Sequence, residues 1–244
     1  IHAMVPMSAL KGWNVVTTLP EWCGYSGPSL LSLLENVPVT PSDEEAELSF
    51  AVQWVEKFHD SATTSQGRRV YWGPVATGVA QVGDEVRVFP SGHQAVVKEV
   101  LTAVRLPTSV SAGHSAGMVL DREVDLSRGD WLVSSQSSLQ PSKQLDVTVA
   151  WLDDEPLVAG RVYWALHGHQ WVKAKVASIT DRLDIHSLES LPASELPANA
   201  IGRVQLSFQQ PLLTLPYGRS RTLGSMVLVD TASHKTSAAV MVQG

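Results

Sequence analysis

The sequence predicts an all-β protein of two tandem antiparallel β-barrels, preceded by a short strand and helix. Three observations predict this fold class. After residue 45, short β-branched or alternating apolar runs recur between Gly, Pro, Asp and Ser residues, a pattern typical of strands joined by turns. Apolar residues at helical spacing occur only near the N-terminus. Two loose polar segments, 38–45 and 134–144, divide the chain into three parts.

The first part is predicted to form a strand, a turn and a helix. Residues 3–7 are apolar and indicate a short strand, and residues 8–12 end in glycine and indicate a turn. Ser29, directly after a proline, stands before the apolar positions of 30–35, which favours the start of a helix. We expect this helix to end near Asn36.

The second part begins after the segment 38–45, which is acidic, contains two prolines and is therefore predicted to be a linker. Gly83-Asp84 and Ser91-Gly92 are expected to form hairpin turns. Six strands, enough to close a small barrel, are predicted at 50–55, 70–75, 85–89, 95–104, 116–120 and 131–133.

The third part follows a second predicted linker at 134–144, which is rich in Ser and Gln. Its strands are predicted at 145–152, 160–167, 170–179, 182–185, 200–208, 225–229 and 240–242. No helix is expected after Asn36. The predicted domains are accordingly residues 1–40, 47–136 and 145–244.

Composition excludes several classes of function. The 244 residues carry 18 basic and 24 acidic side chains, a net charge of −6, with no run of Lys or Arg, so nucleic acid is not an expected partner. Cys23 is the only cysteine, which excludes an intrachain disulfide and predicts a reducing compartment, the cytoplasm. No apolar run approaches the ~20 residues that span a bilayer, so no membrane is expected. The N-terminus is neither a signal peptide nor an initiator Met, which predicts a piece of a longer protein.

No residue pattern indicates catalysis or a metal. His167 and His169 are separated by Gly168 at a predicted hairpin tip, so we expect them to be splayed and solvated rather than metal ligands. The acidic cluster 153–155 precedes a proline and indicates a solvated turn rather than a cation site. No serine lies in a G-x-S-x-G motif and no phosphate-binding G-x-x-x-x-G-K-[ST] loop occurs. The eight tryptophans could offer stacking platforms, but several fall in predicted strands, which favours core packing and a domain interface.

Specific strings nevertheless carry a family resemblance. P-M-S-A-L-K-G, with Ser8, Ala9 and Leu10 at its centre, resembles the last nucleotide-recognition motif of a translation-factor-type GTPase. Further strings resemble the regulatory GTPase subunit of sulfate adenylyltransferase: V-Q-W-V at 52–55, G-P-V-A-T-G at 73–78, V-G-D-E-V at 82–86, D-L-S-R-G-D at 125–130, W-L-D-D-E-P-L at 151–157 and I-G-R-V at 201–204. The likeness extends over nearly the whole chain.

The resemblance implies a fold and a function. Members have a GTPase domain followed by two barrels, so residues 1–40 would be the C-terminal remnant of an α/β GTPase domain with its linker, and the barrels would correspond to domains 2 and 3 of translation factors. Ser8, Ala9 and Leu10 would contact guanine in the intact protein, which would use GTP and Mg. Its partner in a heterodimer would be an ATP-pyrophosphatase-like catalytic subunit, which makes adenylyl sulfate and pyrophosphate from ATP and sulfate, driven by GTP hydrolysis. The barrels would serve as scaffold and partner-binding surfaces, with no cofactor and no catalytic residue in this chain.

The chain departs from that family in several places. The phosphate loop, the D-x-x-G switch and the N-K-x-D motif are absent, Trp13 replaces the usual Asp, and residues 58–67 form a longer, more polar segment than usual. Arg128 and Arg203 are expected to have structural or interfacial roles. Two alternatives stay open: a fragment of a translation elongation-type factor that binds tRNA, against which the scattered basic residues count, and a free-standing β-barrel interaction module.

Overall fold

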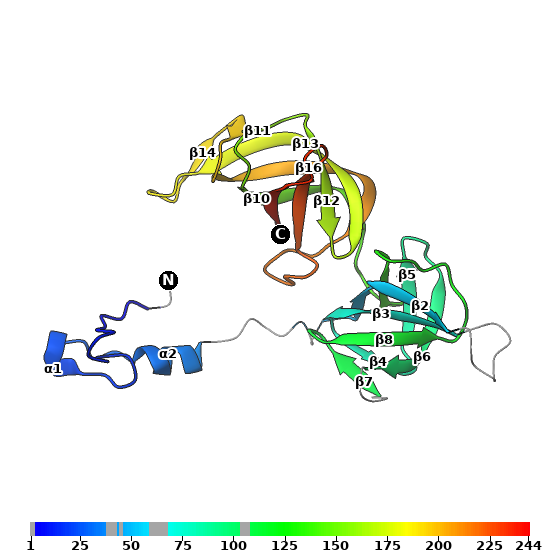
Figure 1. Cartoon of the computed structure of the whole chain (residues 1–244), viewed down its shortest axis with the longest axis horizontal. Helices are drawn as coiled ribbons and strands as arrows, with labels where there is room; N and C mark the ends of the chain where they lie inside the picture. The colour runs from blue at the N-terminus through cyan, green and yellow to red at the C-terminus, as the bar shows by residue number, and fades with distance from the viewer. Residues whose placement is uncertain (1–2, 38–42, 44–45, 59–67, 103–107) are drawn as a thin grey trace. The chain divides into compact units, whose positions relative to one another are not determined.

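The computed structural model describes residues 3–37, 43, 46–58, 68–102 and 108–244 (Figure 1). The chain forms two compact units, Ile1–Ser42 and Asp43–Gly244. The first unit contains two short helices, and the second contains the β-strands. Among the described residues no α-helix follows Asn36, as the sequence predicted.

The first unit contains helices α1 (Pro20–Cys23) and α2 (Leu30–Asn36). The sequence predicted α2 with its C-terminal residue, but missed α1, which is a single turn. The Ser29 hydroxyl oxygen accepts a hydrogen bond from the backbone N–H of Ser32 at 3.2 Å, so it caps a donor that the first helical turn leaves unpaired.

The strand predicted at residues 3–7 is wrong. A strand needs a neighbour for its backbone N–H and C=O groups, and no ladder forms among the described residues of the first unit. One isolated antiparallel bridge joins Ser8 to Trp13. It encloses the predicted turn, in which Gly12 has the left-handed φ of +70° that glycine adopts without steric cost.

The first barrel is a closed sheet of six strands with one flanking strand, as shown in cyan and green in Figure 1. Its strands are β1 (Ser49–Ala51), β2 (Trp54–Phe58), β3 (Arg68–Thr77), β4 (Val79–Gln81), β5 (Glu85–Phe89), β6 (Gln94–Leu101), β7 (Ser109–Ser111), β8 (Ser115–Leu120) and β9 (Trp131–Ser134). The sheet order is β1-β9-β5-β6-β8-β3-β2, and pairing of β1 with β3 closes the ring. β4 and β7 form a separate antiparallel pair.

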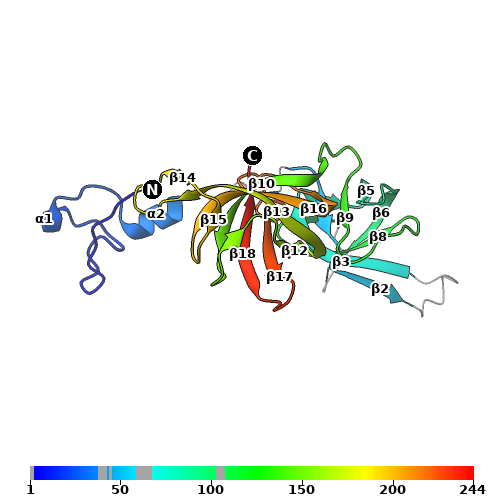
Figure 2. The same ribbon diagram turned by 90° about the horizontal axis from the view of Figure 1, so that it is seen from above.

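The second barrel repeats this plan. Its strands are β10 (Pro141–Trp151), β11 (Leu157–Val158), β12 (Val162–His167), β13 (Gln170–Leu183), β14 (Ser190–Pro192), β15 (Glu195–Leu196), β16 (Ile201–Leu213), β17 (Ser225–Asp230) and β18 (Thr236–Val242). The order β12-β17-β18-β10-β16-β13-β14 is closed by the pairing of β12 with β13, and Figure 2 shows β12, β17 and β18 side by side. The predicted fold class of two antiparallel barrels is confirmed.

The strand predicted at 50–55 is divided into β1 and β2. The Val52 N–H donates to the Asp130 carbonyl oxygen at 2.9 Å, and the Gln53 N–H donates to the Trp72 carbonyl oxygen at 2.8 Å. The chain therefore changes partners between its two halves, and it does so where it crosses Gly73. A Cβ atom on Gly73 would lie 1.9 Å from the Ala51 carbonyl oxygen, so only glycine fits at this crossing.

Other boundaries also differ from the predictions. Two strands were predicted within residues 170–185, but β13 is continuous. It pairs with β16 through two register shifts, at 176/178 and 179/181, and these shifts keep the strand paired where a break was predicted. β10 begins inside the predicted linker 134–144, since Pro141 and Ser142 pair with the end of β16. The short strands β4, β7, β11, β14 and β15 were missed, because two or three residues carry no recognisable period.

Each barrel encloses its own apolar core. Trp151 and Tyr163 are the largest side chains in the second core, with ring centroids 5.6 Å apart in an edge-to-face arrangement. Tyr71 and Phe50 fill the first. The strands of the two sheets extend over Ser49–Ser134 and Pro141–Val242. The predicted domain limits 1–40, 47–136 and 145–244 stay a prediction, and the linker 38–45 lies outside the described residues except for Asp43.

Candidate functional site

The residues predicted to contact guanine form an exposed turn. Ser8 opens it, and its hydroxyl oxygen accepts a hydrogen bond from the Lys11 N–H at 3.3 Å. Ala9 and Leu10 project from its tip, and Leu10 is 96% exposed. The backbone N–H groups of Ala9 and Leu10 make no hydrogen bond with another described residue, so both are free to donate to an acceptor.

Asn14 holds this turn against the rest of the first unit. Its side chain is fully buried; the amide nitrogen donates to the Pro6 carbonyl oxygen at 2.8 Å, and the amide oxygen accepts from the Leu19 N–H at 2.7 Å. Its φ of +56° lies in the left-handed region that Asn tolerates. Asn14 was missed in the sequence because nothing in its neighbourhood distinguishes it from a loop asparagine.

We expect the substitution Asn14→Ala to release the turn at residues 8–12. It removes the hydrogen bonds to the Leu19 N–H and the Pro6 C=O, each of which contributes about 0.5–1.5 kcal/mol. Hydrogen exchange at the Leu19 amide should accelerate accordingly. Asn36→Ala, whose exposed amide nitrogen donates to the Ser32 carbonyl oxygen, is the control and should leave that amide unchanged. Equal exchange rates in the two variants would contradict the role given to Asn14.

Aromatic side chains lie beside the turn. The Trp13 and Trp22 ring centroids are 5.1 Å apart, and the Lys11 ammonium lies 4.2 Å from the centroid of a Trp13 ring. The cation–π contact and the ring pair stabilise the chain on the C-terminal side of the turn. Trp13, noted as a departure from the resembling family, is therefore part of the structure around the turn.

A second candidate region is the contact between the barrels. Trp131, at the start of β9, is fully buried in a cluster with Ala51, Val133, Leu213 and Leu223, which come from both barrels. The sequence predicted a domain interface for some tryptophans, and Trp131 fulfils that role. Trp54 and Trp171 do not lie in a core: they are 61% and 50% exposed.

His167 completes this contact and corrects a prediction. Gly168 and His169 form the expected hairpin tip, but His167 is fully buried instead of solvated because the Trp131 ring covers it, with centroids 5.4 Å apart. A Cβ on Gly168 would lie 2.8 Å from Trp131, so the tip meets the first barrel closely. The His167 Nε2 lies 3.0 Å from the Leu223 carbonyl oxygen and donates to it in the neutral ring.

Three buried polar atoms at this contact have no hydrogen-bond partner among the described residues: Trp131 Nε1, His167 Nδ1 and Gln170 Oε1. Each such atom lowers stability, because it has lost water without gaining a partner. Gly129 brings the first barrel against the same hairpin, since a Cβ there would lie 3.1 Å from the Gln170 Cα. The barrel contact is thus closely packed in shape but incomplete in its hydrogen bonds.

Burial lowers the pKa of His167 below its ordinary value, and the hydrogen bond with Leu223 opposes this effect only in part. As the pH falls below about 6.5, the His167 ring therefore takes up a proton in the unfolded chain but not yet in the folded chain. Stability is present above that pH and is lost as the pH falls toward the folded pKa. We expect the free energy of unfolding to fall by up to about 1.4 kcal/mol per pH unit from this group.

Urea unfolding of the wild type, His167→Gln and His93→Gln at several pH values between 7 and 5 measures this effect. His167→Gln removes the titrating ring and should flatten the slope, whereas the exposed His93 is the control and should leave it unchanged. An identical slope in all three proteins would show that folding does not change the pKa of His167.

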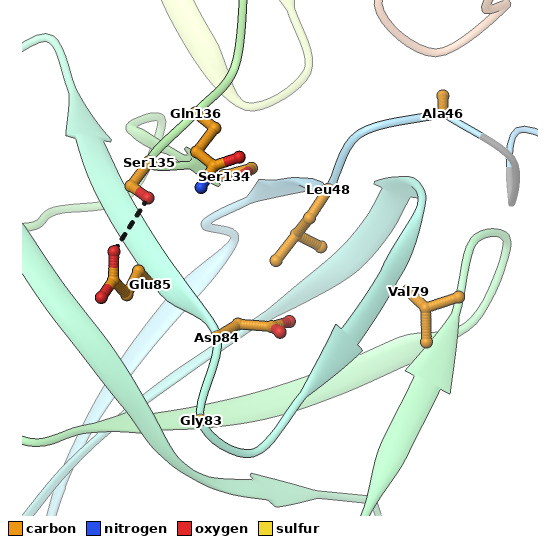
Figure 3. Close-up of a pocket in the computed structure, with 9 residues that line it drawn as sticks. All are labelled: Ala46, Leu48, Val79, Gly83, Asp84, Glu85, Ser134, Ser135 and Gln136. Atoms are coloured by element: carbon orange, nitrogen blue, oxygen red, sulfur yellow. Dashed lines mark hydrogen bonds between the residues drawn. The ribbon is translucent and has the colours of Figure 1, made fainter.

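The first barrel also has an open pocket of about 530 Å³ beside the turn at Gly83 (Figure 3). Asp84 and Glu85 border it, as Figure 3 shows. The Asp84 carboxylate accepts the Gln81 N–H at 2.8 Å, and the Glu85 carboxylate accepts the Ser135 hydroxyl at 3.4 Å. Asp84 stabilises the local turn predicted at Gly83-Asp84, whereas Glu85 contacts the segment that follows β9.

The acidic cluster 153–155 forms the predicted turn. Asp153 accepts a hydrogen bond from the Ser237 hydroxyl at 2.9 Å, and Glu155 pairs with Arg161 at 2.9 Å. In the described part of the chain, no group of three or more His, Cys, Asp or Glu side chains could hold a metal ion. None of the helices described is long and apolar enough to cross a membrane.

The two arginines singled out in the sequence are structural. The Arg203 Nε donates to the Asp181 carboxylate at 2.6 Å, which joins the neighbouring strands β16 and β13 of the second barrel. Arg128 lies near His169, where its positive charge adds to burial in lowering the pKa of that histidine. Arg128 is exposed and directly precedes Gly129, which packs against Gln170, so Arg128 lies at the edge of the barrel contact.

The family model for GTP-eEF1A C-terminal domain-like proteins matches residues 144–243. Sulfate adenylyltransferase subunit 1 of Yersinia enterocolitica is 35% identical over 239 residues, 98% of this chain and 49% of the relative. The proteins of the same name from Sodalis glossinidius and Salmonella typhi are 36% and 31% identical over the same shares. The chain spans about half the length of the curated relatives it matches.

Solved structures with a similar fold include sup35 complexed with GDP, with a TM-score of 0.72, 19% identity and coverage of 98% of this chain and 58% of that chain. Sup35 complexed with GMPPNP gives 0.70 and 19%, and 57% of its length is covered. The barrel architecture is thus that of these nucleotide-bound proteins.

Proposed function

Given that this chain is a homologue of sulfate adenylyltransferase subunit 1 over 98% of its length, we propose that it is part of a GTP-dependent regulatory subunit of that enzyme. Its two barrels are the scaffold and the partner-binding surfaces. The reaction served is the formation of adenylyl sulfate and pyrophosphate from ATP and sulfate, driven by GTP hydrolysis. The partner is an ATP-pyrophosphatase-like catalytic subunit, and the place of action is the cytoplasm.

The barrel contact supports a scaffold that transmits movement. Two closed barrels are rigid bodies, because every strand of each ring is paired on both sides. Their shared contact, by comparison, leaves Trp131, His167 and Gln170 each with one unpartnered polar atom. Rearranging a contact of this kind costs less free energy than rearranging a core in which every polar atom is hydrogen-bonded.

The turn of Ser8, Ala9 and Leu10 is proposed to contact guanine in the intact protein. The free N–H groups of Ala9 and Leu10 suit the carbonyl oxygen of a purine base, and Asn14 fixes the turn that presents them. The sequence has no phosphate-binding loop, so these residues supply base contacts only. GTP with Mg would bring the phosphate chemistry, held by residues outside this chain.

Sedimentation of the 244-residue chain with a purified ATP-pyrophosphatase-like catalytic subunit tests the proposal. We expect a heterodimer. Full-length sulfate adenylyltransferase subunit 1 of Yersinia enterocolitica is the positive control for the catalytic subunit. If that control binds and this chain does not, the scaffold role is wrong.

The same chain should be titrated with aminoacyl-tRNA, because a fragment of a translation elongation-type factor that binds tRNA is the alternative. We expect no binding at physiological salt, since 24 acidic side chains outnumber 18 basic ones. Tight, salt-sensitive binding would favour the translation-factor alternative. Binding to neither probe would favour a free-standing interaction module.

A further inference from the structure

The outer face of β12, together with Trp171 of β13, is apolar where an antiparallel barrel normally presents polar residues. Burial alternates along β12: Tyr163, Ala165 and His167 point inward and are fully buried. The residues between them point outward and are apolar or aromatic. We call the following set, with Trp171 of β13 and Val227 of β17, the outer aromatic face: Val162, Trp164, Leu166, Trp171 and Val227.

The strand register joins these residues into one patch. Leu166 pairs with Trp171 on one side and Val227 on the other. Trp164 pairs with Lys173, whose ammonium lies 5.4 Å from the centroid of a Trp164 ring. Cross-strand neighbours on one face of a sheet are in side-chain contact, so the patch is continuous across three strands.

Positive charge borders this patch without a matching carboxylate. Lys173 and Lys175 are exposed and form no ion pair with any described residue. Both line a shallow pocket of about 320 Å³, together with Val162, Ser207 and Gln209. An apolar ridge beside two unpaired ammonium groups is complementary to an apolar side chain flanked by carboxylates.

We propose that the outer aromatic face is the surface on which the second barrel binds the catalytic subunit. The contacting segment of that subunit places an apolar or aromatic side chain against Leu166 and Trp171, and Asp or Glu beside Lys173 and Lys175. This inference rests on the proposed function and names the surface that carries it. Exposed tryptophans of this kind are frequent centres of protein–protein interfaces.

Other occupants fit less well. A second copy of the chain bound through the same patch would bury the lysines of both copies without a carboxylate. A nucleic acid would need more cations than two lysines on a chain of net charge −6. A carboxylate-bearing protein surface satisfies both the apolar ridge and the lysines.

The test compares the triple variant Trp171→Ala/Lys173→Glu/Lys175→Glu with the wild type in titrations against the purified catalytic subunit. The dissociation constant should rise at least about 30-fold. The matched control, Trp54→Ala/Lys57→Glu, changes an exposed Trp and an exposed Lys on β2 of the first barrel and should bind like the wild type. Lys173→Arg/Lys175→Arg keeps the charge and should retain binding.

Each outcome is decisive. The assignment is supported if only the triple variant binds more weakly and its far-ultraviolet circular dichroism spectrum is unchanged. It is supported further if residues 162–175 are protected from hydrogen exchange in the wild-type complex. Equal binding by the triple variant overturns it and leaves the scaffold role intact. Failure of the wild type to bind overturns the scaffold role and this inference with it. The wild type could instead self-associate or bind an oligonucleotide, lose that binding in the triple variant, and not bind the catalytic subunit. That result also overturns the scaffold role and this inference.

Discussion

Replacing Trp131 by alanine is expected to lower the free energy of unfolding by about 3–5 kcal/mol. The side chain is fully buried between the barrels, where it packs against Ala51 and Val133 of the first and Leu213 and Leu223 of the second. Its Nε1 has no partner in the part of the chain that the structure describes, so the loss comes from packing and from the cavity that remains, not from a hydrogen bond. Urea unfolding followed by circular dichroism measures it.

Trp54→Ala is the control for this prediction. Trp54 is 61% exposed, and substitutions at such positions usually change stability by less than about 0.5 kcal/mol. A loss in Trp131→Ala no larger than in Trp54→Ala would mean that the barrels contribute little to each other's stability.

Replacing Gly73 by alanine is the second change with a severe expected effect. The added Cβ would lie 1.9 Å from the Ala51 carbonyl oxygen and 3.3 Å from the Gln53 nitrogen, both backbone atoms that cannot rotate away. Relief requires β3 to separate from the segment between β1 and β2, so the loss should reach or exceed about 3 kcal/mol, the upper end for overpacking. Denaturant midpoints, or the absence of folded protein, report it.

Gly218→Ala separates the steric effect from the general effect of replacing a glycine. No heavy atom lies within 4 Å of a Cβ at that position, and its φ is outside the left-handed region. We expect it to be neutral or stabilising by up to about 1 kcal/mol. Equal midpoints for the two variants would contradict the close crossing at Gly73.

The fold class was predictable because strand signals are local. Runs such as β5 and β17 combine β-branched residues with flanking turns, and the Gly83-Asp84 turn is specified by its own residues. The division of 50–55 into β1 and β2 was not predictable, since it depends on Gly73 and Asp130, which are remote in sequence. The strand expected at 3–7 failed for the same reason: apolar residues indicate a strand only where a partner strand is present.

The candidate sites were less accessible from sequence. The exposed turn of Ser8, Ala9 and Leu10 was found through a string, but Asn14, which holds it, has no such signal. His167 was expected in solvent because its neighbours indicate a hairpin tip, and only the approach of Trp131 from the other barrel buries it. Sites made by contacts between distant segments depend on packing that local patterns do not encode.

The ring of strands in the first barrel can close only after β9 has been synthesised. Phe50 of β1 pairs with Leu132 of β9, and such distant pairing, roughly 80 residues along the chain, slows folding. At about 5–20 residues per second, the ribosome needs several seconds to deliver β9 after β1. Throughout that time one edge of β1 stays open, and the nascent chain displays Phe50, which is later fully buried. During that interval the nascent chain is open to chaperones, to proteases and to association with other nascent chains.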